Sequence, residues 1–452
     1  MTTGVENLGI RIPSILLPDK SVDMSKWSVV ACDQYTSQPE YWARVEALVG
    51  KAPSTLHMIL PEVYLEKSGW EERVAQINKV MVEYLEQNLL KPQNSCFIYV
   101  DRKTSRSQSR KGLILAVDLE KYDYRPGSQT LIRATEGTVL ERLPPRIKVR
   151  ENASLELPHT MLLIDDEGRT VIEPLADKVE QLEKLYDFDL MMGGMHIKGY
   201  RVDDENTVDR IFNALRKLSD RDSFRKKYNV GGDKGVLLFA VGDGNHSLAA
   251  AKGHWENVKK GLSREEAADH PARFALVEVV NVHDEGLKFE PIHRVVFNVD
   301  GAGLLESMVG YFNKRNSKCR YRFFENRKAL DTEMESARRD KSCHVLRFSF
   351  SGKYGAVVVK NPCHTLEVGT LQEFLDDFIK TDKDIKIDYI HGEPVVDALS
   401  SKAGNMGFYL PPMDKRDLFK TVITEGVLPR KTFSMGEAEE KRFYLECRKI
   451  KK

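Results

Sequence analysis

The chain has 452 residues, of which 41% are hydrophobic and 30% charged, the composition of a soluble globular protein with roughly two to four domains. A disordered or fibrous protein is thereby excluded. The 69 Lys and Arg and 68 Asp and Glu leave a formal net charge of +1, so no overall field draws the chain to nucleic acid or to an anionic membrane. No segment approaches the ~20 apolar residues of a membrane span, and no secretory signal is recognisable, so we expect a cytoplasmic protein.

The cysteines and histidines are scattered along the sequence. None of the six cysteines forms a C-x-x-C pair, and none of the eleven histidines lies in an H-E-x-x-H arrangement. Structural zinc needs paired ligands at short spacing, and a disulfide framework is typical of short secreted chains. We therefore expect free thiols and no structural transition metal.

Hydrophobic spacing predicts alternating helices and strands in the first two thirds of the chain. Helices are expected over residues 39–48, 70–85, 175–186 and 208–218, and strands over 96–100, 113–117, 160–164 and 236–241. The polar run 101–112 is expected to be a hairpin loop that faces water. From about Gly303 onward the pattern changes to a helix, two strands and two further helices. Together these patterns predict an α/β core followed by an α+β domain.

The sharpest motif is the apolar run 236–241, which is followed by Gly-Asp-Gly and an Ala-rich helix. This order places free backbone N–H groups and the positive end of a helix at Asn245 to Leu248, where phosphate binds well. Asp243 ends the strand and is a candidate Mg²⁺ ligand or proton acceptor, and His246 is a candidate to neutralise developing charge. The alternative, in which Asp243 only caps the helix and His246 bonds locally, fits the sequence equally well.

A second cluster, residues 133–150, is rich in arginine. The planar guanidinium suits bidentate binding of phosphate oxygens, so Arg133, Arg142 and the neighbouring Thr138 are candidates to bind phosphate. Glu136 lies among these cations, which would keep it ionised as a base or metal ligand. Taken alone, such a stretch is more often a surface with ion pairs.

Other segments carry basic or imidazole groups beside a strand or a Pro-marked turn, namely His159, His293 with Arg294, and Arg430 with Lys431. For each of these segments singly, a structural role is favoured. The loop 191–196 is expected to be a turn, with a lid as the alternative. The sequence contains no P-loop, dinucleotide-binding or protein-kinase motif, so a phosphotransferase would be of an unusual kind.

The strand followed by VGDGNHSLAAAK resembles the D-G-H-x-R helix start of the ParB/sulfiredoxin-like fold, in particular the free L-serine kinases built on it. The ordered motifs RATEGT, LPHTMLLIDD, VGDGNH, HDEGLKFEPIHR and LPRKTFSMGEA resemble longer bacterial and protist relatives that include pyrophosphate-dependent serine kinases. The resemblance implies an α/β protein with an N-terminal α/β region at 1–130, a ParB/sulfiredoxin-like phosphate-binding catalytic core at 131–300 and a C-terminal α+β domain at 301–452.

The resemblance also implies a reaction and its residues. A phosphoryl group would pass from pyrophosphate, with Mg²⁺, to the hydroxyl of free L-serine, giving O-phospho-L-serine and phosphate. Glu136 would take the serine proton, while Asp243 and His246 would lie beside the phosphates, with Asp243 as the metal ligand. Gly244 would form the phosphate-binding turn.

The chain departs from the family motif at two positions. Ser247 stands where arginine is common, and Asn245 replaces a histidine. We expect both to lie at the phosphate site, with the missing guanidinium supplied from elsewhere. The candidates to supply this guanidinium are Arg142, Arg294 and Arg430, and Lys431 and His293 are further candidates to bind phosphate.

Three alternatives stay open at this point. Archaeal relatives that resemble the core use ADP, so ADP or ATP is an alternative donor. A nucleotide-dependent ParB-like clamp on DNA would need a helix-turn-helix and a basic surface. A sulfiredoxin-like reductase would need a reactive cysteine near the phosphate turn, and neither motif contains one. We expect no nucleic-acid or membrane partner, and the sequence predicts no oligomeric state.

Overall fold

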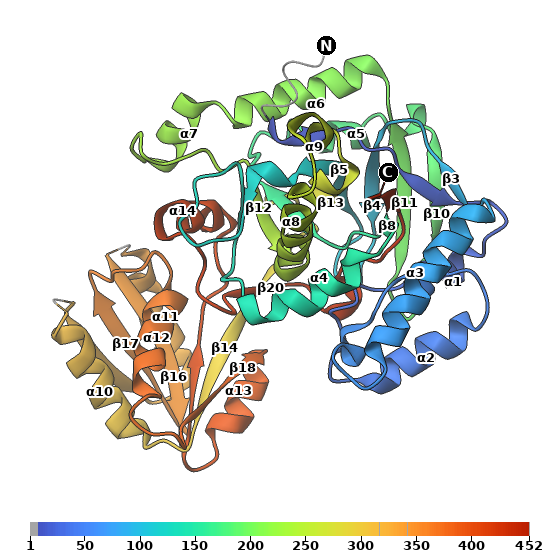
Figure 1. The fold of residues 1–452 in the computed structure, drawn as a ribbon. Helices are drawn as coiled ribbons and strands as arrows, with labels where there is room; N and C mark the ends of the chain where they lie inside the picture. The colour runs from blue at the N-terminus through green and yellow to red at the C-terminus, as the bar shows by residue number, and fades with distance from the viewer. Residues whose placement is uncertain (1–7, 316, 341, 452) are drawn as a thin grey trace. The chain divides into compact units, whose positions relative to one another are not determined.

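The computed structural model describes residues 8–315, 317–340 and 342–451 and contains two large sheets, one in each of two units (Figure 1). Unit 1 comprises the chain up to Lys288 together with the segment from Met435 onward, and unit 2 comprises Phe289–Ser434. The C-terminal segment thus returns to the unit in which the chain starts.

The strands of unit 1 are β1 (Ile10–Arg11), β2 (Leu16–Pro18), β3 (Leu90–Pro92), β4 (Phe97–Arg102), β5 (Arg110–Asp118), β6 (Tyr122–Asp123), β7 (Ile132–Ala134), β8 (Leu155–Glu156), β9 (Met161–Ile164), β10 (Lys184–Asp189), β11 (His196–Val202), β12 (Phe239–Asp243), β13 (Phe274–Asn281) and β21 (Arg448–Lys449). The main sheet has ten strands in the order β10-β11-β4-β5-β13-β9-β12-β7-β6, with β1 paired to β5. Parallel pairs such as β12 with β7 and β13 with β9 lie among antiparallel ones, so the sheet is mixed.

The helices of unit 1 are α1 (Met24–Trp27), α2 (Pro39–Val49), α3 (Trp70–Glu86), α4 (Leu143–Glu151), α5 (Glu173–Ala176), α6 (Glu205–Leu218), α7 (Arg221–Tyr228), α8 (Asn245–Lys259) and α9 (Arg264–Ala268). Side chains of β4 alternate between two cores, as strand geometry requires. Phe97 and Tyr99 pack with α6 and α8, whereas Ile98 and Val100 pack with α2, α3 and the C-terminal segment. The helices α4 and α8 lie side by side (Figure 1).

Unit 2 contains a seven-stranded sheet in the order β15-β17-β16-β19-β14-β18, with a further strand, β20, paired to β14. Its strands are β14 (Phe289–Phe297), β15 (Cys319–Phe324), β16 (Cys343–Phe350), β17 (Lys353–Lys360), β18 (Lys386–His391), β19 (Asn405–Tyr409) and β20 (Phe433–Met435). Its helices are α10 (Gly301–Asn313), α11 (Arg327–Arg339), α12 (Glu367–Phe378), α13 (Glu393–Ser400) and α14 (Lys415–Glu425). The pairs along this order are antiparallel. A mixed sheet and an antiparallel sheet, each with helices, confirm the predicted α/β class.

The helix predicted over 175–186 is wrong. After the short α5, the chain makes a single 3-10 turn at Val179–Gln181 and then enters strand β10. The ring of Tyr186 lies against Gly199 of β11, where an added Cβ would meet the ring at 2.1 Å. Pairing of β10 with β11 across this close contact outweighs the local helical spacing, which is a weaker determinant.

The polar run 101–112 is only partly the water-facing loop predicted from its charge. Arg102 and Arg110 lie in β4 and β5 and are buried. Arg102 donates to the carbonyls of Glu439 and Lys441, both at 2.9 Å, and Arg110 donates to the carbonyl of Glu440 at 2.9 Å. These two arginines therefore fasten the C-terminal segment to the main sheet.

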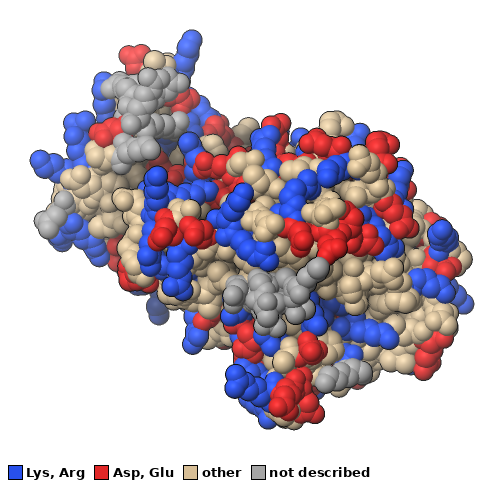
Figure 2. All heavy atoms as spheres, turned by 90° about the horizontal axis from the view of Figure 1, so that it is seen from above, with Lys and Arg blue, Asp and Glu red and all other residues tan. Residues whose placement is uncertain are grey.

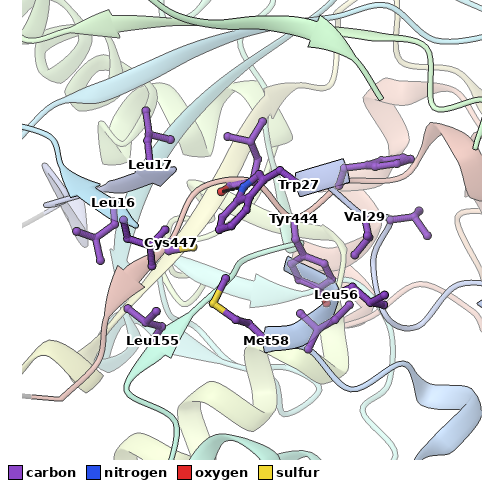
Figure 3. Packing of buried hydrophobic residues seen from close by; sticks show 14 of the residues in the cluster. Leu16, Leu17, Trp27, Val29, Leu56, Met58, Leu155, Tyr444 and Cys447 are labelled. Carbon is purple, nitrogen blue, oxygen red and sulfur yellow. Dashed lines mark hydrogen bonds between the residues drawn. The ribbon is translucent and has the colours of Figure 1, made fainter. Parts of the chain in front are cut away.

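The C-terminal segment also packs into the core of unit 1. Figure 3 shows Tyr444 and Cys447 among apolar side chains that include Trp27, Met58 and Leu155. The indole of Trp27 donates to the carbonyl of Leu445 at 3.0 Å. The segments that contain Trp27 and Leu445 are thus packed against each other.

The surface and the thiols agree with the composition. Figure 2 shows basic and acidic side chains interspersed over the face in view, as a net charge of +1 leads one to expect. All six cysteines are free thiols, which confirms that prediction. Among the described residues, none of the helices combines the length and the apolar character that crossing a bilayer requires.

Candidate functional site at the start of helix α8

The turn between β12 and α8 is shaped by Gly244. This residue has φ +78°, a conformation that favours glycine, and its backbone lies against Thr160. An added Cβ would come within 2.9 Å of Thr160 Oγ1 and 3.0 Å of Thr160 Cα. The next residues start a helix of fifteen residues, so their backbone N–H groups and the positive end of the dipole point to one place. The strand, turn and helix are arranged as the sequence predicts, and anion binding at this turn stays a prediction.

The two predicted motifs meet at this turn. Strand β7 runs parallel to β12, and the loop after β7 contacts the first residues of α8. The Thr135 N–H donates to Asn245 Oδ1 at 3.3 Å, and the Val139 N–H donates to His246 Nε2 at 3.3 Å. Glu136, half-buried, lies in the loop between these two contacts. The loop that contains Glu136 and the turn at Gly244, more than a hundred residues apart in sequence, therefore lie side by side.

Thr138 lies in the same loop and is one of several described residues with a buried polar atom that lacks a partner. Its Oγ1 is buried and has no hydrogen-bond partner among the described residues. A buried hydroxyl without a partner costs free energy, about 1–3 kcal/mol. An acceptor such as a phosphate oxygen would satisfy it, which agrees with the predicted role of Thr138.

Asp243 is half-buried, and both of its carboxylate oxygens have partners. Oδ1 accepts from the N–H of Gly244 at 3.1 Å, and Oδ2 lies 3.3 Å from Nζ of Lys441. Sequence reasoning missed Lys441, which comes from the C-terminal segment held by Arg102. The carboxylate is thus neutralised by a lysine of the same chain.

His246 stands next to basic side chains at and just before the start of α4. Burial lowers its pKa, and the nearby positive charges of Arg146 and Arg142 lower it further. Its Nε2 accepts from a backbone N–H, so the ring is neutral with the proton on Nδ1. Arg142 is exposed, whereas Arg146 is paired with Glu62 at 2.6 Å.

Ser247 belongs to a chain of hydrogen bonds that sequence reasoning did not find. Its Oγ lies 3.0 Å from Nε2 of His159, and Nδ1 of His159 lies 2.7 Å from the hydroxyl of Tyr444. Asp33 Oδ2 is 3.8 Å from the same Nε2. Ser247, His159 and Tyr444 come from the middle and the end of the sequence, so no local spacing connects them.

Arg133 binds backbone rather than lying at the turn. Its guanidinium donates to the carbonyls of Thr130 at 2.8 Å and Val236 at 3.1 Å, and also to that of Gly235. These carbonyls precede β7 and β12, whereas Gly244 follows β12. Burial lowers the pKa of Arg133 to about 10. The structure therefore places this arginine at the other end of the two strands.

The remaining phosphate-binding candidates belong to unit 2. Arg294 is fully buried and donates to Gln372 Oε1 at 3.1 Å and to the carbonyl of Arg430 at 2.9 Å. Arg430 is paired with Asp376. His293 Nδ1 accepts from the N–H of Leu410 at 3.1 Å. Lys431 is exposed, with a positive φ of 55°. Within unit 2 these contacts hold β14 to its neighbours.

One group of three potential metal ligands occurs among the described residues. Ligand atoms of Asp165, Glu167 and His283 lie within 4.8 Å of one another. Asp165 already accepts from His283 at 2.6 Å and pairs with Lys227 at 2.9 Å. The group follows the far end of β9 from Thr160, so it is separate from the α8 turn, and Asp243 is not part of it.

Comparison with known proteins places the chain in a family. No curated protein matches. Among solved structures, a free serine kinase variant in complex with AMP aligns with TM-score 0.38 and 11% identity, covering 75% of this chain and 92% of that chain. A conserved hypothetical protein from Pyrococcus furiosus aligns with TM-score 0.33 and 12% identity over 74% of this chain and 90% of that one. C-terminally truncated SbnI from Staphylococcus aureus gives TM-score 0.32 and 9% identity over 74% and 82%.

A family model matches residues 16–378, which include both motifs of the site and most of the two units. That match covers well over half of the sequence. The chain therefore belongs to the family described as protein of unknown function (DUF1015).

Proposed function

We propose that this protein is a phosphotransferase that moves a phosphoryl group to the hydroxyl of a small molecule, with free L-serine as the acceptor. One observation carries the proposal. The loop with Glu136 is bonded on both sides of that residue to the first turn of α8, at Asn245 and His246. Such a transfer requires two parts in one place, a carboxylate and the N-terminus of a helix that binds phosphate.

Each residue of the site has a distinct task in this reaction. The first N–H groups of α8 and the Thr138 hydroxyl would bind the oxygens of the transferred phosphoryl group. Glu136 would accept the proton of the acceptor hydroxyl as its oxygen attacks phosphorus and the bond to the leaving phosphate breaks. Arg142 and Lys441 would stabilise negative charge around the transferring group.

The side chains around the α8 turn fit a Mg²⁺ ion only if the ion arrives bound to the phosphates of the donor. Asp243 offers a single carboxylate that is already paired with Lys441, so this side chain alone is no built metal site. Mg²⁺ commonly uses one or two carboxylates and otherwise substrate phosphates and water. Such an ion, held by the donor phosphates and Asp243, would supply positive charge to the phosphoryl oxygens.

The donor is proposed to be a phosphoanhydride. ADP, ATP and pyrophosphate present the same terminal phosphoryl group to the turn, so the described contacts of the α8 start suit all three. The experiment is a donor screen with L-serine and Mg²⁺, with phosphoserine followed by mass spectrometry. Phosphoserine with any one of the three donors supports the proposal and identifies the donor. If none of the three donors yields phosphoserine, serine is not the acceptor. If, in addition, no donor loses phosphate in the presence of other hydroxyl compounds, the whole proposal is overturned.

A further inference from the structure

A cavity of about 160 Å³ lies beside the first turn of α8, within unit 1. Its walls are mostly aliphatic and include Met58, Leu60, Ile77, Met81, Leu155 and Leu276. Ser247, His159 and Tyr444 also line it, so its polar edge is the hydrogen-bonded chain described above. Figure 3 shows Met58, Leu155 and Tyr444 converging in this part of the core.

The charged side chains around the cavity are already matched. Arg146 is paired with Glu62 at 2.6 Å, and Arg150 is paired with Glu156. A charged ligand in this partly open cavity would lose part of its hydration without gaining an unpaired opposite charge, which is unfavourable. Free L-serine, with an ammonium and a carboxylate on a three-carbon skeleton, is therefore a poor occupant.

The size of the cavity indicates what fits. An apolar protein cavity of roughly 150 Å³ holds a molecule as large as benzene. The hydroxyl of Ser247 and the imidazole of His159, 3.0 Å apart, can exchange their mutual hydrogen bond for bonds to a ligand hydroxyl. Shape and polarity together fit a neutral molecule with an apolar body and one hydrogen-bonding end.

We propose that this cavity is a binding site for a small neutral amphiphile, whose apolar body of about benzene's size lies among the aliphatic walls and whose hydroxyl contacts Ser247 and His159. The inference does not depend on the proposed phosphoryl transfer. It assigns a second ligand to the protein, next to the phosphate-binding turn, because both Ser247 and the N–H groups of that turn belong to the start of α8.

The test uses the full-length protein with ¹³C-labelled methionine methyl groups and benzyl alcohol as the probe. Met58 and Met81 line the cavity, while Met308 and Met406 are buried in unit 2 and act as internal controls. We expect saturable shifts of the Met58 and Met81 signals with a Kd of about 1 mM, the scale for a ligand of this size. Absence of saturation, or equal shifts at Met308 and Met406, overturns the proposal.

Two variants sharpen the result. Met81→Trp fills the cavity and should abolish binding, whereas Val82→Trp, on the exposed face of the same helix, should leave it unchanged. Ser247→Ala should weaken the binding of benzyl alcohol about fivefold and leave the binding of toluene unchanged, because only the alcohol uses the lost hydrogen bond. Unchanged binding by a folded Met81→Trp protein contradicts the site. Should that variant fail to fold, the wild-type titration decides alone.

Discussion

Lys441 Nζ lies 3.3 Å from Asp243 Oδ2, so a residue close to the C-terminus provides the counter-charge for the carboxylate at the end of β12. Both side chains are partly buried, with 13% and 22% of their surface exposed. Water therefore screens this pair less than a surface ion pair. The C-terminal segment is part of the candidate site and not only a structural tail.

Replacing Lys441 by Met should lower both stability and activity. The substitution leaves Asp243 without its partner, so we expect a loss of about 1 kcal/mol in the free energy of unfolding and at least about a tenfold fall in phosphoryl transfer. Lys441→Arg, which keeps the charge, should recover most of both. Lys449→Met, at an exposed position of β21, is the matched control. Urea unfolding and the phosphoserine assay measure the two effects, and equal behaviour of the Lys441 and Lys449 variants would contradict this role.

Substituting Gly244 should disturb the turn in two ways. Alanine at φ +78° is strained, and its Cβ would collide with Thr160. Gly127→Ala provides the control, because Gly127 has a similar φ of +77° but no atom within 4 Å of an added Cβ. We expect about 1 kcal/mol of destabilisation at Gly127 and about 2–4 kcal/mol at Gly244 in urea unfolding. Similar losses at both positions would show that the contact with Thr160 is unimportant.

Much of the site could be predicted because its two motifs are local in sequence. An apolar strand, a Gly-Asp-Gly turn and a helix follow one another in the sequence, and the structure has them in that order around Gly244. The juxtaposition with Glu136 followed from treating RATEGT and VGDGNH as parts of one pocket, and the contacts of Thr135 and Val139 agree with it. The catalytic roles of these residues stay predictions.

Other parts of the site depend on partners that no spacing shows. Lys441 and Tyr444 lie in the C-terminal segment, whose carbonyls are bound by buried Arg102 and Arg110 and whose apolar side chains pack into the core of unit 1. An arginine in a polar run gives no sign of whether it binds phosphate, water or backbone carbonyls. Arg133 is the same case, since its carbonyl partners follow from strand pairing and not from its neighbours in sequence.

Replacing Arg102 by Met should release the C-terminal segment. The guanidinium donates to the carbonyls of Gly194, Glu439 and Lys441, which would all lose this donor. The bond to Gly194 is buried and the other two are partly buried, so we expect a loss of about 2–4 kcal/mol. Arg106→Met, at an exposed arginine of the same run, should change stability by less than about 1 kcal/mol. Chemical denaturation and limited proteolysis near residue 440 report the effect, and an intact C-terminus in the Arg102 variant would contradict it.

Two histidines of unit 2 should affect the pH dependence of stability in opposite directions. Burial lowers the pKa of His293 to about 4, so the unfolded chain binds its proton more readily and stability falls as the pH drops below about 6.5, by up to about 3 kcal/mol. A hydrogen bond to Glu425 raises the pKa of His364, so its contribution is present at acid pH and is lost as the pH rises through the raised pKa.

His293→Gln should therefore reduce the loss of stability between about pH 7 and about pH 5, and His364→Gln should increase it. Urea midpoints across this range measure both slopes. If the urea midpoints of the two variants change equally with pH, neither histidine determines how stability falls at acid pH.

Glu136→Gln tests the candidate base with minimal change in shape. The amide has the size of the carboxylate but cannot accept a proton, so we expect an unchanged unfolding curve and a fall in kcat of at least about 100-fold. Glu141→Gln, exposed in the following turn at Leu140–Arg142, is the matched control and should keep full activity. If Glu136 acts as the base, the variant should also lose the acid limb of the pH–rate profile, because that limb reports the carboxyl group. A normal rate with the acid limb intact would instead assign proton removal to a different group, and a lower rate with the limb unchanged would assign Glu136 to positioning alone.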